Sequence, residues 1–442
     1  MWRSFLARSQ PLLSRLRPVR QPSARSYFNG GADRRRPTMA NPGGGPKHLY
    51  VALEDTNGHA LFKLDVGDLA GDDSDVATGM AEPQPFPQPA LRLSFRSFGE
   101  SAQFNALGRK IVVTTGSFRG NRKYLTLVYD TKTSKLDIQP FVPDGLTATY
   151  DTLAAGNKLY AFSSHRLPLY YLCDVQAHPE LDDDDDADDE SEPDESESEP
   201  ELYDHDGVDL NLLRELAEER WTWKRSPTSI PIPCDTSDPS FKGVRFHVTD
   251  GQAVHPDGRT IFLSTTDHFR KSRNTFSLDT DQPGGEWTRL GDWNLPFISR
   301  AHYDRDLDAW VGIQRKQGTG SHHLCSCDLP ATGGNPTPQP AWKLCAENLT
   351  FMQAPLVSTD RTLVHAGRGR FCLVEVAPPL GGSQARHCLH DDVDQEHLLQ
   401  VTMFHASYGK NGELMATPLG PGRLYRMSSY DPFTGMFRAF WM

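Results

Sequence analysis

The chain has 442 residues, of which 37% are hydrophobic, and it contains 36 glycines and 33 prolines. This composition favours short strands joined by tight turns over a helical bundle, and no apolar run approaches the roughly 20 residues that span a bilayer, so we expect no membrane span. The formal net charge of −12 comes from one acidic segment. Without this segment and the arginine-rich first 31 residues, the chain is close to neutral, and no basic surface indicates a nucleic-acid partner.

Residues 1–46 are predicted to be a mitochondrial transit peptide followed by a disordered linker. The first 31 residues hold six arginines and no acidic residue, and their apolar residues recur at helical spacing, which is the composition of a transit peptide. Arg25 lies two residues before a cleavage site that we expect near Tyr27. The alternatives are a disordered basic tail, a plastid address, or translation from Met39, which would leave the protein in the cytoplasm or nucleus.

Residues 47–442 read as strands and turns that recur in units of roughly 45 residues, the period of propeller blades. The sequence therefore predicts an all-β, kelch-like β-propeller of about seven blades. Six blades is the alternative, because the sixth unit has the weakest fourth strand. The units span residues 48–96, 101–141, 149–225, 248–293, 301–348, 352–376 and 400–442.

Most units share one order of features. An inner strand ends in a tight turn with Gly or Asn, a buried apolar strand follows, a third strand ends in Asp, and a fourth carries an aromatic residue. Aromatic side chains fill the widening gap between blades, so Trp287, Trp342 and Phe437 are predicted to lie in the core. Phe440 and Trp441 are expected to close the last blade. The predicted turn glycines are Gly108, Gly156, Gly258 and Gly412.

An acidic insertion interrupts the third unit at about residues 180–206, which hold seventeen Asp or Glu and no Lys or Arg. A segment with so few apolar residues cannot offset its ordering entropy and is predicted to be disordered. It is either a solvated expansion or an interaction segment for a basic partner. A short helix is predicted at about 208–221, with Leu210, Leu213 and Trp221 near one face.

One run, His322–Cys327, has the residue types of a metal site. On a strand, His323, Cys325 and Cys327 face one side and offer three soft ligands. Zinc sites, however, need wider cysteine spacing and ligands from a second element, so we interpret the run as a buried third strand. The chain has seven cysteines, an odd and scattered set that indicates reduced, buried thiols.

Two further patterns have weak functional interpretations. Asp304, Asp306 and Asp308 alternate before a buried strand and could bind a divalent cation, but a solvated turn fits them better. Residues 366–370 are glycine-rich, yet they open no helix and make a poor phosphate cradle. The sequence contains no nucleophile elbow, Walker motif or HExxH, so it assigns no catalytic, cofactor-binding or metal-binding residue and no cofactor.

Three stretches carry a family resemblance. AVHPDGRTIF at 253–262, GDWNLPF at 291–297 and DLDAWVG at 306–312 resemble a plant, mainly grass, family of uncharacterised kelch-like proteins called domain of unknown function 1668. The resemblance covers roughly residues 47–442. It implies a propeller fold without an established activity, and it supplies no site residues.

Two functions follow from this pattern. The preferred one is a non-enzymatic scaffold that binds a protein or peptide partner on the top face of the propeller or at the mouth of its central channel, because no inner-strand loop shows a convergent set of titratable groups. The alternative is a hydrolase or oxidoreductase, since propeller enzymes assemble sites from loops far apart in sequence. A channel ringed by His, Asp and Glu would favour the enzyme.

Overall fold

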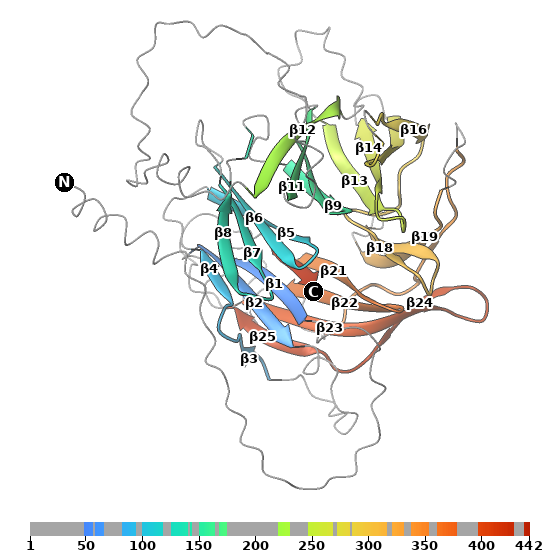
Figure 1. Cartoon of the computed structure of the whole chain (residues 1–442). Coiled ribbons are helices and arrows are strands. Elements are labelled where there is room, and N and C mark those ends of the chain that lie inside the picture. Colours follow the sequence, from blue (N-terminus) through green and yellow to red (C-terminus); the bar gives the residue numbers. More distant parts are fainter. Residues whose placement is uncertain are drawn as a thin grey trace, which may run out of the picture.

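In the computed structural model, every regular element of the described residues is a β-strand, and those residues contain no helix (Figure 1). The predictions for residues 1–46, 180–206 and 208–219 fall outside the described part of the chain. The described residues are 48–55, 58–65, 82–93, 100–117, 125–139, 142–143, 150–163, 168–174, 220–229, 246–267, 272–282, 285–315, 321–330, 337–352, 360–377, 397–427 and 437–442.

The strands form six sheets, which are the blades of a propeller, and the strand pairs are antiparallel apart from one short parallel pair, Gln84–Pro85 with Arg423–Met427. Strands inside the blades are buried on both faces, as the strand Arg370–Ala377 shows with seven consecutive buried residues, because each blade packs between two neighbours. From the inner strand outward, the first three blades are blade 1, β26 (Arg438–Trp441), β1 (His48–Asp55), β2 (Gly58–Asp65) and β4 (Leu91–Leu93); blade 2, β5 (Glu100–Leu107), β6 (Lys110–Ser117), β7 (Thr126–Asp130) and β8 (Lys135–Gln139); and blade 3, β9 (Tyr150–Ala155), β10 (Lys158–Ser163), β11 (Pro168–Asp174) and β12 (Trp221–Ser229).

The other three blades follow in chain order. Blade 6 carries two additional strands, of which one comes from blade 1. The strands are, in blade 4, β13 (Phe246–Val254), β14 (Thr260–Asp267), β15 (Ser272–Asp279) and β16 (Thr288–Gly291); in blade 5, β17 (His302–Asp304), β18 (Ala309–Arg315), β19 (His322–Cys327) and β20 (Trp342–Leu344); and in blade 6, β21 (Asp360–Gly367), β22 (Arg370–Ala377), β23 (His397–Tyr408) and β25 (Arg423–Met427), with β24 (Leu414–Pro418) and β3 (Gln84–Pro85) added.

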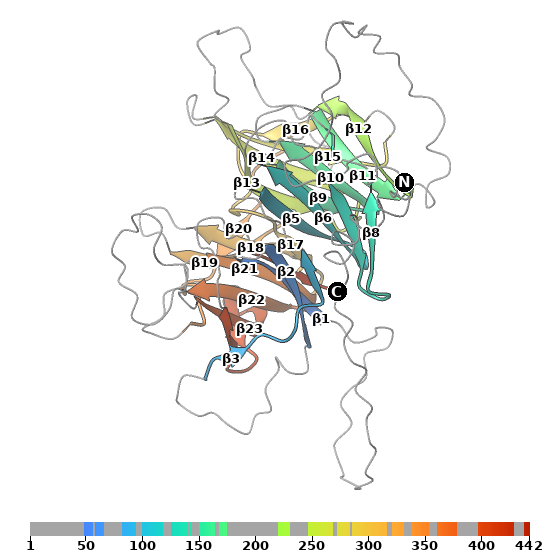
Figure 2. The same cartoon turned by 90° about the vertical axis from the view of Figure 1, so that its left-hand side faces the viewer.

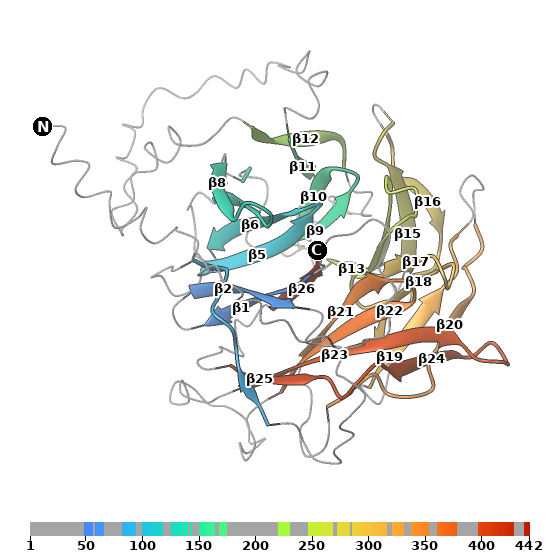
Figure 3. The same ribbon diagram turned by 60° about the horizontal axis from the view of Figure 1, so that its bottom comes forward.

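The six inner strands form a closed ring. β26 contacts β5, and the contacts continue in turn through β9, β13, β17 and β21 back to β26. In Figure 3 the sheets are arranged around a centre in which the C-terminus lies. The blades were predicted to number about seven, and that number is wrong, whereas the six-blade alternative is confirmed.

The seven-blade prediction failed at the last two units. The sixth unit supplies only β21 and β22, which cannot make a blade alone, and they combine with β23 and β25 of the seventh unit. β22 and β23 pair along a register that runs from Arg370 and His405 to Ala377 and Leu398. The remaining strand, β26, is thereby left to pair with β1, whose edge would otherwise be open.

The ring is therefore closed by its two chain ends. β26 pairs antiparallel with β1, and His48 and Met442 exchange both backbone hydrogen bonds, at 2.7 and 3.0 Å. A second connection crosses the same seam, because β3 from blade 1 pairs with β25 of blade 6 (Figure 1). Figure 2 shows β3 just below β23 of the same blade. Phe86, next to β3, stacks on Tyr425 and packs against Phe62, with ring centroids 4.9 and 4.5 Å apart.

The predicted turn glycines adopt the conformation that tight hairpins need. Gly108 and Gly156 have φ of 57° and 58°, a region that other residues enter only with strain. We call the turn face the side of the ring that carries the connections between the first and second, and the third and fourth, strands of each blade. Antiparallel pairing puts both kinds of connection on one side.

The acidic insertion leaves and re-enters blade 3 at neighbouring positions on the turn face. Asp174 at the end of β11 pairs with Trp221 at the start of β12, so Trp221 belongs to a strand and not to the predicted helix. Arg220 joins the two ends, donating from Nη2 (2.9 Å) and Nε (3.1 Å) to one carboxylate oxygen of Asp174. The sheet is complete without the residues between these ends.

Deleting residues 182–200 should therefore leave the propeller intact. The deletion shortens a loop whose ends are already held by Arg220 and Asp174, and loop-closure entropy changes only slowly with length. We expect the melting temperature to change by less than about 2 °C, measured by differential scanning fluorimetry. A drop of several degrees would mean that the acidic residues pack on the blades.

The predicted aromatic core is confirmed in part. Phe437 is fully buried between blades 1 and 6, and Trp287 packs on the cluster between blades 3 and 4. Trp342 is 42% exposed, so its prediction is wrong: it lies on the edge strand β20, where no further strand covers it.

Candidate functional site

The histidine and cysteine run forms β19 in blade 5. Both ring nitrogens of His323 have partners, Nδ1 the carbonyl oxygen of Cys345 (3.0 Å) and Nε2 the hydroxyl of Ser321 (2.9 Å). Cys325 and Cys327 are buried in the cluster between blades 4 and 5. Burial raises the pKa of both thiols, that of Cys327 to about 12. This packing opposes the thiolate form that zinc needs.

The aspartates at 304, 306 and 308 lie in the turn between β17 and β18. Oδ1 of Asp304 accepts the backbone amides of Asp306 (2.9 Å) and Leu307 (3.0 Å). Asp308 has a left-handed backbone, with φ of 46°, and its Oδ1 accepts the Tyr303 hydroxyl at 2.7 Å. The carboxylates of Asp304 and Asp308 thus shape a turn, as the sequence predicted, but Asp304 is buried and not solvated as expected.

Asp304 also connects blade 5 to blade 6. It is fully buried, and its Oδ2 accepts His365 Nε2 (2.8 Å) and the Gly369 amide (2.7 Å). Burial alone would raise the pKa of Asp304, but the hydrogen bonds from His365, Gly369 and Leu307 outweigh it and hold the pKa at about 2. His365 donates from Nε2 to this carboxylate, and its side chain is 25% exposed.

The glycine-rich residues 366–370 include the hairpin turn between β21 and β22. Gly367, Arg368 and Gly369 all have positive φ, at 87°, 57° and 68°. The Gly369 amide is already bonded to Asp304. The turn thus lacks the free amide at this position that a phosphate-binding nest would use.

Polar side chains near the axis join blades that are distant in sequence. Arg300, just before β17, donates from Nη2 to the Thr152 carbonyl of β9. The Thr152 hydroxyl donates to Asn105 Oδ1 of β5, and His302 Nε2 donates to the Leu363 carbonyl of β21 at 3.1 Å. These bonds span blades 5 and 3, 3 and 2, and 5 and 6, and sequence spacing gave no signal for them.

His302 resists protonation in this position. Burial, then the nearby charges of Arg300 and His365, lower the pKa of His302 to about 3, against the opposing effect of the Leu363 carbonyl. Since the unfolded chain takes up this proton near pH 6.5, His302 destabilises the fold as the pH falls from about 6.5 towards 3. Asp304 affects stability at a lower pH than His302, because its stabilising effect is lost only as the pH falls from about 3.8 towards 2.

His302→Gln should therefore reduce the loss of stability in mild acid. Glutamine can still donate to the Leu363 carbonyl but does not titrate. Between pH 7.5 and 5, we expect the melting temperature of the variant to fall a few degrees less than that of the unmodified protein. An equal fall in both proteins, measured by scanning calorimetry, would contradict the assignment.

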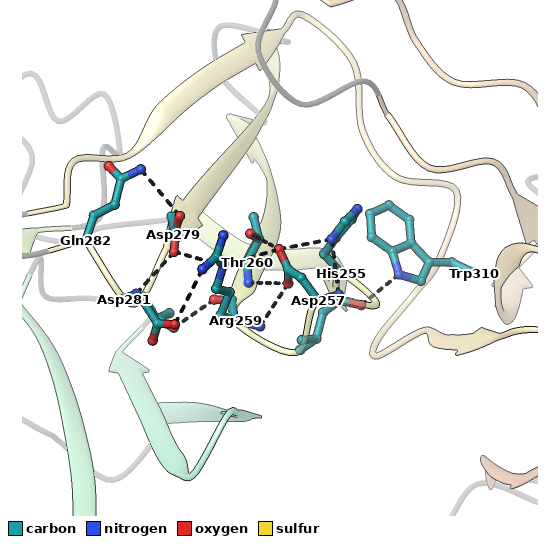
Figure 4. Close-up of polar contacts among 10 residues, drawn as sticks. His255, Asp257, Arg259, Thr260, Asp279, Asp281, Gln282 and Trp310 are labelled. Carbon is teal, nitrogen blue, oxygen red and sulfur yellow. Dashed lines mark hydrogen bonds and ion pairs between the residues drawn. The ribbon is translucent and has the colours of Figure 1, made fainter. Parts of the chain in front are cut away.

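The inner turn of blade 4 keeps its charges paired (Figure 4). Oδ1 of Asp257 accepts the amides of Arg259 and Thr260, both at 2.9 Å. The Arg259 guanidinium lies 3.8 Å from the carboxylates of Asp257, Asp279 and Asp281. The single arginine of this turn is thus surrounded by acidic groups of its own blade.

The connection between blades 4 and 5 is packed between their sheets. Residues 293–297 lie there, and two glycines make the space: a Cβ on Gly251 would lie 2.9 Å from the Leu295 side chain, and one on Gly312 would lie 2.5 Å from the Phe297 ring. Such contacts do not occur between real Cβ atoms and side chains, so the segment requires glycine at both positions.

Trp310 completes this interface. It is fully buried, its Nε1 donates to the Val254 carbonyl at 2.9 Å, and its ring meets Phe262 edge-on with centroids 4.9 Å apart. One cluster contains Phe262, Phe297 and Trp310. Residues from three separate stretches therefore meet in a single core between blades 4 and 5.

Three findings concern the described ranges as a whole. No three His, Cys, Asp or Glu side chains there lie close enough together to hold a metal ion. No helix there has the length and apolar character to cross a membrane. Each cysteine there is buried and free, as predicted; they are Cys173, Cys325, Cys327, Cys345 and Cys372.

A family model described as protein of unknown function (DUF1668) matches residues 46–421. The chain belongs to the DUF1668 family. No curated protein matches it. In this DUF1668 member, the stretches at 253–262, 291–297 and 306–312 contribute to the core between blades 4 and 5, so the resemblance rests on packing residues.

Solved structures similar to this DUF1668 protein share 10% sequence identity with it. An α-L-arabinofuranosidase from Clostridium thermocellum has a TM-score of 0.32, over 73% of this chain and 95% of its own. A protein from Lactobacillus plantarum has a TM-score of 0.36, over 86% and 99%. A prolyl endopeptidase has a TM-score of 0.32, over 88% of this chain and about half (51%) of its own.

Proposed function

We propose that this protein is a non-enzymatic propeller scaffold that binds a protein or peptide partner at the channel mouth on the turn face. The observation that carries the proposal is the tying of neighbouring inner turns to one another. Asp304 joins the turns of blades 5 and 6, and the Gly156 amide donates to the Gly258 carbonyl between blades 3 and 4 at 2.6 Å. Turns held in this way form a rigid platform, which lowers the entropic cost of binding.

The polar groups nearest the axis support the same proposal. Arg300, Thr152 and Asn105 use their hydrogen-bonding groups to connect blades, and so does His302. Groups committed to such bonds preserve the shape of the mouth, and exposed side chains on the turns are left to make contacts with a partner.

Proximity labelling of the tagged full-length protein tests the scaffold. We expect a reproducible set of labelled proteins. This set should be lost when exposed side chains on the turn face are substituted and kept when exposed side chains on the opposite face are substituted. Labelling indistinguishable from that of an untethered labelling enzyme would contradict the proposal.

One observation favours an enzyme as the second candidate. A buried carboxylate that orients a partly exposed histidine, as Asp304 does for His365, is the arrangement of a general base. A panel of ester, peptide, glycoside and nicotinamide-coupled substrates tests it. Turnover that is lost in His365→Asn would support the enzyme, and no turnover of any class would count against it.

We also propose that residues 1–46 direct the protein to mitochondria. The arginine-rich, acid-free composition supports this. A fluorescent fusion of residues 1–45 should coincide with a mitochondrial marker. Diffuse fluorescence would contradict the address and favour synthesis from Met39.

A further inference from the structure

The connection between β19 and β20 of blade 5 ends in a proline-rich stretch on the turn face. Residues 337–342 have the sequence TPQPAW. A proline ring fixes φ near −65°, and a residue that precedes proline is biased towards extended and polyproline II conformations. Each of the four residues 337–340 is a proline or precedes one, so this stretch favours the left-handed polyproline II helix.

The exposure of these side chains follows the period of that helix. Polyproline II has three residues per turn, so side chains three positions apart lie along one edge. Thr337 is buried and Pro340 is partly buried, whereas the pairs at 338 and 341 and at 339 and 342 are exposed. One edge therefore packs on the propeller, and the other two edges face solvent.

Hydrogen bonds hold both ends of the stretch. The Thr337 amide donates to the Leu290 carbonyl at 2.7 Å, and the Thr337 carbonyl oxygen accepts Trp293 Nε1 at 3.0 Å. At the other end, the Ala341 carbonyl oxygen accepts the Asp328 amide at 2.9 Å. Within the described ranges no hydrogen bond reaches the three residues between these ends, and their carbonyl oxygens can accept from a partner.

A tryptophan completes the exposed surface of the stretch. Trp342 is 42% exposed and begins the edge strand β20, which no further strand covers. Tryptophan is enriched among the residues that contribute most of the binding energy at protein interfaces. The stretch thus presents an indole ring two positions after Pro340.

The conformation of the stretch determines the kind of partner that fits it. Domains that recognise polyproline II dock such segments in grooves lined by aromatic side chains. Their ligands lose little conformational entropy, because the helix exists before binding. A stretch that the propeller already holds at both ends loses still less.

We propose that residues 337–342 form a docking segment for a protein domain whose aromatic-lined groove binds polyproline II. Pro338 and Trp342, one from each exposed edge, contact the groove, and Thr337 attaches the segment to blade 4. The segment lies at the outer rim of the turn face. It therefore goes beyond the scaffold proposed above and does not require the channel mouth.

A panel of purified, immobilised SH3, WW and EVH1 domains, probed with the full-length protein, tests the segment. We expect at least one domain to bind with a micromolar Kd. For that domain, Pro338→Ala and Trp342→Ala should each weaken binding about fivefold to thirtyfold. The matched control is Pro421→Ala, which changes an exposed proline outside the segment and should alter binding less than twofold.

Both substituted side chains are exposed, so the variants should melt within about 2 °C of the unmodified protein. If Pro338→Ala melts lower than this, Trp342→Ala alone decides the outcome. Three results would overturn the segment: a panel in which no domain binds, binding that Trp342→Ala leaves unchanged, or binding that Pro421→Ala weakens as much as the segment variants do.

Discussion

Removing residues 435–442 is expected to abolish the single cooperative unfolding transition, or to lower the melting temperature by more than about 10 °C. The deletion takes away β26, which pairs with β1 from Leu49 to Ala52. It also removes Phe437 from the core between blades 1 and 6 and Phe440 from the core between blades 1 and 2. Burial of each ring contributes about 1.5–3 kcal/mol, and the open edge of β1 invites aggregation.

Deletion of residues 182–200 is the control for this experiment. It removes more residues but no described strand. Its melting temperature, measured by circular dichroism, should therefore be close to that of the unmodified protein. If removing 435–442 leaves the melt unchanged, the C-terminal strand does not close the ring.

Trp310→Ala is expected to destabilise the protein by about 3–5 kcal/mol, the range found when a fully buried aromatic residue is truncated. The change empties the centre of the core between blades 4 and 5, leaves the Val254 carbonyl without its donor and removes the edge contact with Phe262. Denaturant unfolding followed by fluorescence measures the free energy.

Trp342→Ala is the matched control, because Trp342 is also a blade tryptophan but is 42% exposed. We expect its loss to cost less than about 1 kcal/mol. Equal losses in the two variants would refute a special role for the core between blades 4 and 5, and with it the explanation of the family stretches.

Blades 2 to 5 could be predicted from the sequence because each repeats the same local order of strand, tight turn and buried strand. Gly108, Gly156 and Gly258 mark turns through their own backbone conformation, which depends on few neighbours. The end of the chain could not be divided in the same way. Whether β26 belongs to its own unit or to blade 1 depends on pairing with β1, and no local pattern reports that pairing.

The candidate site was less accessible to sequence reasoning. Asp304 was noticed as part of an alternating acidic turn, but its partner His365 is 61 positions away. Arg300 and Thr152 are 148 positions apart. Contacts of this kind arise only when the ring closes, so they leave no spacing to read.

Closure by β26 is the central claim, and a disulfide cross-link tests it most directly. Val51 and Ala439 are paired across β1 and β26, and opposed residues of antiparallel strands are close enough for a disulfide. Val51→Cys with Ala439→Cys should cross-link under mild oxidation, giving a monomer that migrates faster on a non-reducing gel, whereas neither single variant should. A double variant that forms no intramolecular cross-link, although both thiols react with maleimide after unfolding, would contradict the closed six-bladed ring.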